Sequence, residues 1–273
     1  MKKFVFILVA VVLVGALMLA GCSSGGGSGE FKVGLECNYA PFNWTQTSEG
    51  EDTVPIPGGG YAGGYDVEIA KRIAEGLGKE LVIVKTEWDG LIPAVTTGKI
   101  DAVIAGMSPT EERKSAVDFS EPYYESVHVI VVKADGPYAG ATSLADFSGA
   151  TITGQLNTLH YDLIDQIPGV VKETAMETFP AMIVALQSGK IDGYVSEKPG
   201  AVSAVASNPD LAFVEFPSGQ GFEVSAEDAA IAVALPKGSD DIDKINEIIA
   251  GIPQDEREAI MQKAVEDQPI VTE

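Results

Sequence analysis

From residue 31 onward, stretches with apolar residues at helical spacing alternate with short apolar runs typical of strands. In residues 65–77, Ile69, Ile73 and Leu77 are spaced four apart on one helical face, and Gly78 follows directly, as is typical of a helix end. Short runs rich in β-branched residues separate such stretches and predict buried strands. Strands are predicted over residues 31–37, 81–85, 100–105, 126–133, 150–153, 191–195 and 229–235, and helices over residues 65–77, 91–97, 181–188, 241–250 and 254–266. This alternation predicts an α/β fold with largely parallel sheets.

One helix–turn–strand unit occurs twice. "GKIDAVIAG" at residues 98–106 returns as "GKIDGYVSE" at residues 189–197, and the flanks "EWDGLIPAVTTGKID" and "TFPAMIVALQSGKID" align upstream without a gap. Trp88 then aligns with Phe179, and Val95 with Leu186. We predict two lobes of similar build. Because ligands of open α/β sheets sit at the carboxyl ends of strands, the different endings of the two copies would offer different chemistry to one ligand.

The first residues have a different pattern. A basic start is followed by an uncharged run over residues 4–20 and by "LAGC" at residues 19–22, which predicts a secretory signal peptide over residues 1–21. An uncleaved membrane anchor is the alternative, since the run is at the short limit for a span. Residues 22–30, rich in Gly and Ser, are predicted to form a flexible tether. The rest divides into a first lobe of residues 31–132 plus 229–273 and a second lobe of residues 133–228, with hinge crossings near residues 131–134 and 226–230.

Charge and cysteine content narrow the function. The 273 residues include 40 acidic and 18 basic side chains, for a net charge of −22, which argues against nucleic acid or anionic lipid as a partner. The charge would weakly favour cationic small molecules, although solubility explains it equally well. Cys22 and Cys37 are the only two cysteines in the chain, so clustered thiolate metal sites are excluded. We expect no metal and no cofactor.

"SPTEER" at residues 108–113 is the most informative short motif. Ser108 is predicted to cap a helix, with Pro109 at the first helical position and Glu111 completing a capping box. A helix N-terminus attracts anions, and Arg113 one turn later could clamp a carboxylate with two hydrogen bonds. The alternative is a surface helix on which Arg113 pairs with Glu111 or Asp118.

Glu197 ends the second copy of the repeat, at the carboxyl end of its predicted strand. Taken alone, it could be an exposed loop residue. If it faces Arg113 across a cleft, it becomes an acceptor for an ammonium group. A carboxylate held by one lobe and an ammonium held by the other would identify the ligand as an α-amino acid.

Five motifs in order resemble one family. "YAPFNW", "GYDVEIAKRIAEGL", "DGLIPAV", "SPTEERKSAVDFSEPYY" and "GKIDGYVSE" are similar to the polar amino-acid-binding proteins of ABC importers, solute-binding protein family 3. The resemblance covers nearly everything after the tether. It implies a type II periplasmic-binding-protein fold, in which two lobes with mostly parallel sheets flanked by helices are joined by a two-strand hinge. It also implies a monomer that captures a free L-amino acid by hinge closure and delivers it to a permease. "LAGC" resembles a lipobox, which implies lipid attachment at Cys22 and an extracytoplasmic, membrane-anchored location.

The resemblance also implies roles for single residues. Arg113 and Ser108 would hold the ligand carboxylate with help from the backbone at Gly106 and Thr158, Glu197 would hold the ammonium group, Tyr39 and Trp88 would sandwich the side chain, and Glu36 would accept hydrogen bonds from its end. The chain departs from the family in three ways. Glu36 and Glu197 are each one methylene longer than the family's aspartate, Ala105 replaces a serine, and residues 47–60 form an unusual insertion that could border the cleft.

A buried Glu36 favours a basic ligand, arginine or lysine, with glutamine as the rival because its amide can also donate. A cleft enzyme of the same fold, resembling a dehydratase, is the alternative of another class. His160 would be its only plausible base, since His128 lies in an apolar run. A Cys37–His160 nucleophile pair is disfavoured because the two lie on different predicted lobes. A transmembrane sensor domain is a third possibility, disfavoured because no second hydrophobic span appears.

Overall fold

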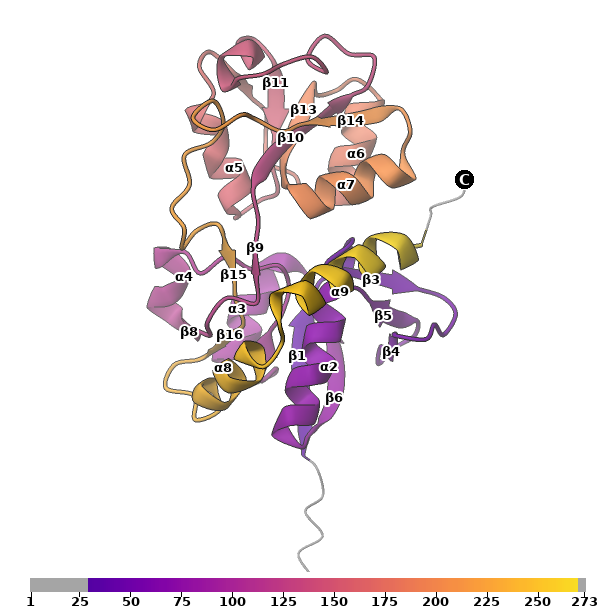
Figure 1. Cartoon of the computed structure of the whole chain (residues 1–273), viewed down its shortest axis with the longest axis vertical. Coiled ribbons are helices and arrows are strands. Elements are labelled where there is room, and N and C mark those ends of the chain that lie inside the picture. Colours follow the sequence, from indigo (N-terminus) through magenta and orange to yellow (C-terminus); the bar gives the residue numbers. More distant parts are fainter. Residues whose placement is uncertain (1–28, 270–273) are drawn as a thin grey trace, which may run out of the picture.

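The computed structural model describes residues 29–269 and shows two lobes, each built on a five-stranded sheet with helices on its faces (Figure 1). The predicted two-lobed α/β fold is confirmed. The predicted signal peptide, Cys22 and most of the tether lie outside the described residues. Within residues 29–269, no helix is both long and apolar enough to span a membrane.

The first lobe contains both ends of the described chain. Its strands lie in the order β6-β1-β7-β16-β8, and only β16 runs opposite to the other four. The predicted helical face is confirmed, since Ile69 and Ile73 of α2 are fully buried. The strands are β1 (Glu30–Leu35), β6 (Glu80–Lys85), β7 (Ala102–Val103), β8 (Val117–Phe119) and β16 (Ala234–Pro236), and the helices are α2 (Tyr65–Leu77), α3 (Trp88–Thr96), α4 (Glu111–Ala116), α8 (Ile242–Ala250) and α9 (Gln254–Asp267).

The second lobe repeats this plan. Its order is β12-β11-β13-β10-β14, again with a single reversed strand, β10, in the fourth place. The strands are β10 (His128–Lys133), β11 (Thr151–Thr153), β12 (Val171–Lys172), β13 (Gly193–Glu197) and β14 (Leu211–Val214), the helices are α5 (Leu159–Leu163), α6 (Phe179–Gln187) and α7 (Lys198–Ser207), and two short 3₁₀ turns are η1 (Leu144–Phe147) and η2 (Ile164–Gln166). The mostly parallel direction of both sheets agrees with the prediction.

The lobe boundary differs from the prediction. A boundary after residue 132 would cut β10, which pairs along its length with β13 and β14 of the second lobe. The chain crosses earlier, at β9 (Tyr124–Glu125), and returns at β15 (Ala230–Ile231), and these two strands pair antiparallel between the lobes (Figure 1). The strand predicted over residues 229–235 is therefore two short strands, β15 in the hinge and β16 in the first sheet. An apolar run shows that a strand is buried but not which sheet buries it.

The repeated "GKID" joins a helix to a strand in both lobes. Gly98 and Gly189 turn the chain with φ of 73° and 76°, in the left-handed region that favours glycine. The carboxylate of Asp101 accepts the backbone N–H of a residue in β1 at 2.7 Å, and that of Asp192 accepts one in β11 at 2.8 Å. The motif therefore ends the helix and fastens the next strand to the parallel strand beside it in its own sheet.

Gly189→Ala should lower the free energy of unfolding by about 1 kcal/mol, because a Cβ at positive φ is strained even where space is open. The nearest heavy atom to a Cβ at Gly189 would be Nζ of Lys133 at 3.7 Å, so no clash adds to the strain. Urea unfolding measures the effect. Gly140→Ala is the matched control: it lies in the same lobe in open space without positive φ and should be neutral or slightly stabilising. Equal losses in both variants would contradict the explanation.

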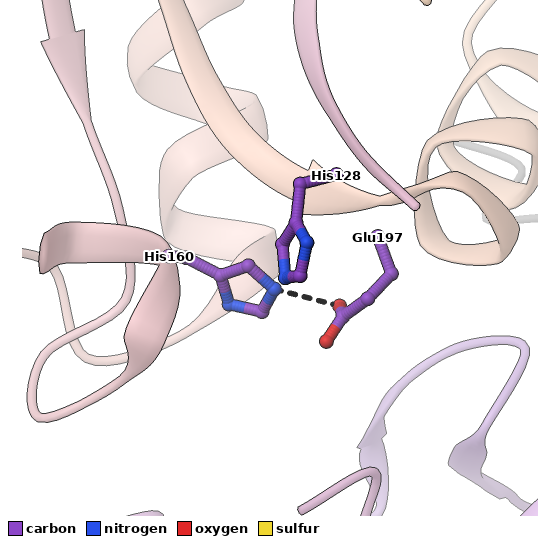
Figure 2. A group of neighbouring side chains, drawn as sticks. All are labelled: His128, His160 and Glu197. Atoms are coloured by element: carbon purple, nitrogen blue, oxygen red, sulfur yellow. Dashed lines mark ion pairs between the residues drawn. The ribbon is translucent and has the colours of Figure 1, made fainter. Parts of the chain in front are cut away.

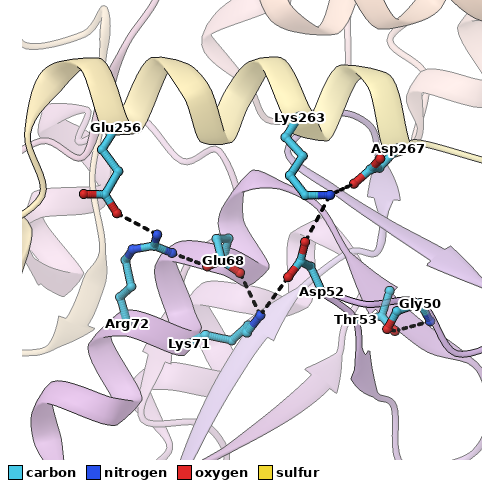
Figure 3. Close-up of polar contacts among 9 residues, drawn as sticks. All are labelled: Gly50, Asp52, Thr53, Glu68, Lys71, Arg72, Glu256, Lys263 and Asp267. Atoms are coloured by element: carbon cyan, nitrogen blue, oxygen red, sulfur yellow. Dashed lines mark hydrogen bonds and ion pairs between the residues drawn. The ribbon is translucent and has the colours of Figure 1, made fainter.

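Residues 47–60 pack against the outer side of the first lobe, and Ile56 is part of that lobe's hydrophobic core. They include β4 of a small sheet of order β2-β3-β5-β4 and line a hollow of about 560 Å³ against α9. Asp52 lies 3.6 Å from Nζ of Lys71 on α2 and 3.2 Å from Nζ of Lys263 on α9 (Figure 3). None of these residues lines the cavity between the lobes, so the expectation that they border the cleft is wrong. The strands of the small sheet are β2 (Asn38–Tyr39), β3 (Asn43–Gln46), β4 (Val54–Pro55) and β5 (Tyr61–Gly63).

Candidate functional site

A small cavity lies where the carboxyl ends of the central strands of both lobes meet. The lobes close on each other so tightly that only about 10 Å³ remains there. All the predicted ligand-binding residues except Glu36 line this cavity. Its lining is Tyr39, Trp88, Gly106, Ser108, Arg113, Gln155, Thr158, Leu159, His160 and Glu197. Two larger hollows, of about 560 and 510 Å³, lie elsewhere and contain none of the predicted site residues.

Arg113 forms the cationic side of the cavity. Its guanidinium donates to the carbonyl oxygens of Ser108 (2.9 Å) and Asn157 (3.0 Å) and lies 5.0 Å from the centre of the Trp88 ring. It pairs with no carboxylate in the described part of the chain. Burial lowers the pKa of Arg113 to about 10, since few nearby charges offset the lost hydration. Unused N–H groups of a guanidinium held in this way are suited to a carboxylate.

The local helix differs slightly from the prediction. α4 begins at Glu111, and its N-cap is Thr110, whose hydroxyl accepts the backbone N–H of Arg113 at 3.4 Å. The proposed capping box around Ser108 is therefore wrong. The surface alternative for Arg113 is also wrong, because Glu111 pairs with Lys114 (3.2 Å) and Asp118 with Lys237 (2.8 Å).

Glu197 forms the anionic side from the second lobe. Its side chain is buried, with 2% of the residue exposed, so the alternative of an exposed loop glutamate is wrong. Its Oε2 accepts a hydrogen bond from the hydroxyl of Tyr39 in the first lobe and lies 2.8 Å from Nε2 of His160. Burial raises the pKa of Glu197 to about 8. A positive charge placed beside Glu197 would therefore stabilise its ionised form.

Glu36 lies next to the cavity without lining it. It is 3% exposed, and both carboxylate oxygens accept from Nε2 of Gln155 in the second lobe, at 3.1 and 3.2 Å. Burial raises the pKa of Glu36 to about 7, and the Gln155 hydrogen bond opposes that shift only partly. Gln155 was not predicted. Its place directly after the strand predicted over residues 150–153 was the signal that could have identified it.

The aromatic residues meet across the cleft. Tyr39 stacks on Phe179 of the second lobe with ring centroids 4.1 Å apart, while the indole nitrogen of Trp88 donates to the carbonyl of Asn157 at 3.1 Å. Both predicted sandwich residues, Tyr39 and Trp88, thus line the cavity and contact the opposite lobe. Phe179 was not predicted as a contact, although the repeat aligns it with Trp88.

A buried polar network shapes the first-lobe wall and explains part of the "GYD" motif. Asp66 is fully buried; it accepts from the Asn43 amide (2.8 Å) and from the Tyr123 hydroxyl (2.7 Å). The Tyr123 oxygen accepts the backbone N–H of Gly106 at 3.2 Å. That N–H therefore already has an acceptor, which limits the backbone help predicted from Gly106. Thr158, the other predicted backbone contact, lies at the start of α5, and its hydroxyl donates to the Gln155 carbonyl at 2.7 Å.

The nucleophile pair considered above has no support in this geometry. Cys37 is 2% exposed in the first lobe, whereas His160 lies on α5 of the second. Burial raises the pKa of the Cys37 thiol to about 12, so the sulfur stays protonated and unreactive. Its burial agrees with a space-filling role.

Comparisons with known proteins agree with the fold and the site. Residues 31–267 match the family model of bacterial extracellular solute-binding proteins, family 3. The arginine-binding extracellular protein ArtP of Bacillus subtilis is 33% identical over 257 residues, covering 91% of this chain and 92% of that protein. A probable histidine-binding protein of Campylobacter jejuni is 34% identical over 193 residues, or 70% of each chain.

Solved structures give the same result. An amino acid ABC transporter substrate-binding protein from Streptococcus pneumoniae bound to L-arginine superposes with a TM-score of 0.75 at 29% identity, covering 87% of this chain and 94% of that one. An ancestral arginine-binding protein bound to glutamine gives a TM-score of 0.70 at 30% identity, with 86% and 97% covered. The chain therefore belongs to the bacterial extracellular solute-binding proteins of family 3 and has the two-lobed type II periplasmic-binding-protein fold.

Proposed function

We propose that this protein is the extracytoplasmic substrate-binding protein of an ABC transporter and that it captures a free L-amino acid between its lobes. The observation that carries the proposal is the placement of a partly buried guanidinium and a buried carboxylate, Arg113 and Glu197, on different lobes around one cavity. These groups match the two charges of an amino acid zwitterion. The named relatives, which include arginine- and histidine-binding proteins, support the same ligand class.

Capture would require the lobes to separate and close again. About 10 Å³ of space admits no amino acid, so the ligand can enter only after contacts across the cleft break. These contacts are the hydrogen bonds from Tyr39 to Glu197, from Gln155 to Glu36, from Asn157 to Asp89 at 2.9 Å, and from Trp88 and Arg113 to the Asn157 carbonyl. The paired strands β9 and β15 are the natural hinge. The closed form would then dock on the permease.

The ligand is proposed to be basic, arginine or lysine. Glu36 and Glu197 are both buried carboxyl groups, whereas among residues 29–269 Arg113 is the one cationic side chain that lines the cavity. A ligand carrying a second positive charge would balance Glu36 and could stack between aromatic rings. Glutamine is the second candidate, because its amide can donate to Glu36 and a similar arginine-binding protein has been solved with glutamine bound.

The same proposal includes attachment to the membrane and binding of the ligand without chemical conversion. A lipid on Cys22, behind a cleaved signal peptide, would hold a monomeric receptor at the membrane near its permease. Binding without chemistry is proposed because the thiol of Cys37 stays protonated and because the relatives in this family are described as solute-binding components. The enzyme alternative finds no support among them.

Calorimetric titration with the twenty amino acids tests ligand and class together. Arginine or lysine should bind most tightly, and Glu36→Gln should weaken arginine binding about 10- to 150-fold, the equivalent of about 1.5–3 kcal/mol for a hydrogen bond to a charged group. Glutamine binding should change less. Glu80→Gln, an exposed glutamate on β6, is the matched control. Tight binding of glutamate with arginine inert would contradict the charge argument, and no binding of any amino acid would overturn the function.

A further inference from the structure

Three potential metal ligands converge beside the cavity in the second lobe. His128 on β10 lies directly opposite Glu197 of β13 in the antiparallel register, so the two side chains lie on one face of the sheet. α5 brings His160 to the same place, with its ring centre 5.5 Å from that of His128. One donor atom from each of the three residues lies within 4.8 Å of the others, and their side chains point toward one another (Figure 2).

The proposed amino acid site uses Glu197 but neither histidine. His160 is 5% exposed, and neither of its ring nitrogens has a hydrogen-bond partner among residues 29–269. Its Nε2 lies 2.8 Å from Oε2 of Glu197, a separation that a shared proton or a bound cation would explain.

We propose that His128, His160 and Glu197 bind a divalent transition-metal ion of the zinc class. Two imidazole nitrogens and one carboxylate oxygen are a common donor set for such ions, whereas Ca²⁺ and Mg²⁺ prefer oxygen alone. Bonds of about 2.0–2.1 Å place tetrahedral ligands about 3.4 Å apart. The observed separations, 2.8 Å between His160 and Glu197 and no more than 4.8 Å among all three residues, bracket this value. The fourth position would face the cavity, where the Tyr39 hydroxyl already contacts Glu197.

Zinc titration by calorimetry tests the site directly. We would use the full chain, purified in mild detergent without a polyhistidine tag, stripped with EDTA, and carrying Cys22→Ser in every sample to remove that thiol. One Zn²⁺ should bind per chain without any amino acid present. His128→Gln and His160→Gln should each weaken binding about 100-fold or more, since even an outer partner of a ligand is worth 10–100-fold. Co²⁺ should give the visible absorption of a nitrogen–oxygen tetrahedral site.

Controls separate a built site from general attraction to an acidic protein. Glu215→Gln, an exposed glutamate of the same lobe, should leave zinc binding unchanged, and circular dichroism checks that each variant is folded. Absence of zinc binding, equal affinity in His128→Gln and Glu215→Gln, or Ca²⁺ binding as tight as that of Zn²⁺ would overturn the proposal.

A competition experiment addresses the shared carboxylate and rests on the proposed function. Because Glu197 would serve both zinc and the ligand ammonium, saturating zinc should lower the apparent affinity for arginine relative to a titration in EDTA. Equal arginine affinity in the two conditions would overturn the sharing of Glu197. Failure of all twenty amino acids to bind even in EDTA would overturn the proposed function and leave the zinc result, measured without any amino acid, standing by itself.

Discussion

Arg113→Ala should weaken arginine binding by about 2–5 kcal/mol, or about 30- to 5,000-fold. The guanidinium is held by the carbonyls of Ser108 and Asn157 and by the Trp88 ring, so its orientation is set before a ligand arrives. Truncation would remove the guanidinium that binds the ligand's carboxylate and would leave this carboxylate without a partner in a nearly dry cavity. Calorimetry at fixed pH and salt measures the loss.

Two further variants sharpen this test. Arg113→Lys keeps the charge but not the planar fork or the stacking on Trp88, and it should recover only part of the affinity. Arg72→Ala removes an arginine of the first lobe that pairs with Glu68 and Glu256 on the outer face, away from the cavity (Figure 3). It should leave arginine binding unchanged. If Arg113→Ala also left the affinity unchanged, the carboxylate would be held elsewhere.

Glu197→Gln should weaken arginine binding by a similar 2–5 kcal/mol and should change how binding depends on pH. Because burial raises the pKa of Glu197 to about 8, the group is largely protonated at neutral pH before the ammonium arrives. Binding of the ammonium favours the carboxylate and releases a proton. Affinity in the wild type should therefore fall as the pH is lowered from 9 to 6, and proton release should appear as a dependence of the calorimetric heat on the buffer.

The Glu197→Gln variant should not release the proton that comes from Glu197. It should still release the proton that comes from Glu36, whose pKa is raised to about 7. Glu215→Gln should release both protons. The raised pKa of Glu197 also affects the stability of the ligand-free protein. Because the pKa in the folded state lies above the ordinary 4.5, Glu197 contributes stability that is present below pH 4.5 and is lost as the pH rises through about 8. Unchanged proton release in Glu197→Gln would contradict the assignment.

The elements that were predictable were those whose apolar pattern is local. The helix α2 was predicted with its observed bounds because Ile69 and Ile73 repeat on one face and Gly78 ends it. The repeat correctly indicated that two lobes share one plan. The meeting of Arg113 and Glu197 at one cavity was predictable because each follows or ends a central strand of its lobe, and the carboxyl ends of strands lie at one edge of each sheet.

Features that depend on distant partners could not be predicted in this way. β10 has the same apolar pattern whichever sheet accepts it, so the lobe boundary was placed wrongly. The roles of Gln155 and Phe179 depend on how the lobes close. The cluster of His128, His160 and Glu197 shows no metal-site spacing, because its members are 160 − 128 = 32 and 197 − 160 = 37 positions apart.

The reversed strand β16 has a consequence for the order in which the two lobes can fold as the chain emerges, N-terminus first. All five strands of the second lobe lie within residues 128–214, so that half can complete its sheet as soon as this stretch has emerged. In the other half, β16 lies between β7 and β8 and is translated more than a hundred residues after them. Until residues 234–236 arrive, β8 has no neighbour in its sheet. The half that is synthesised first is therefore the half that finishes folding last.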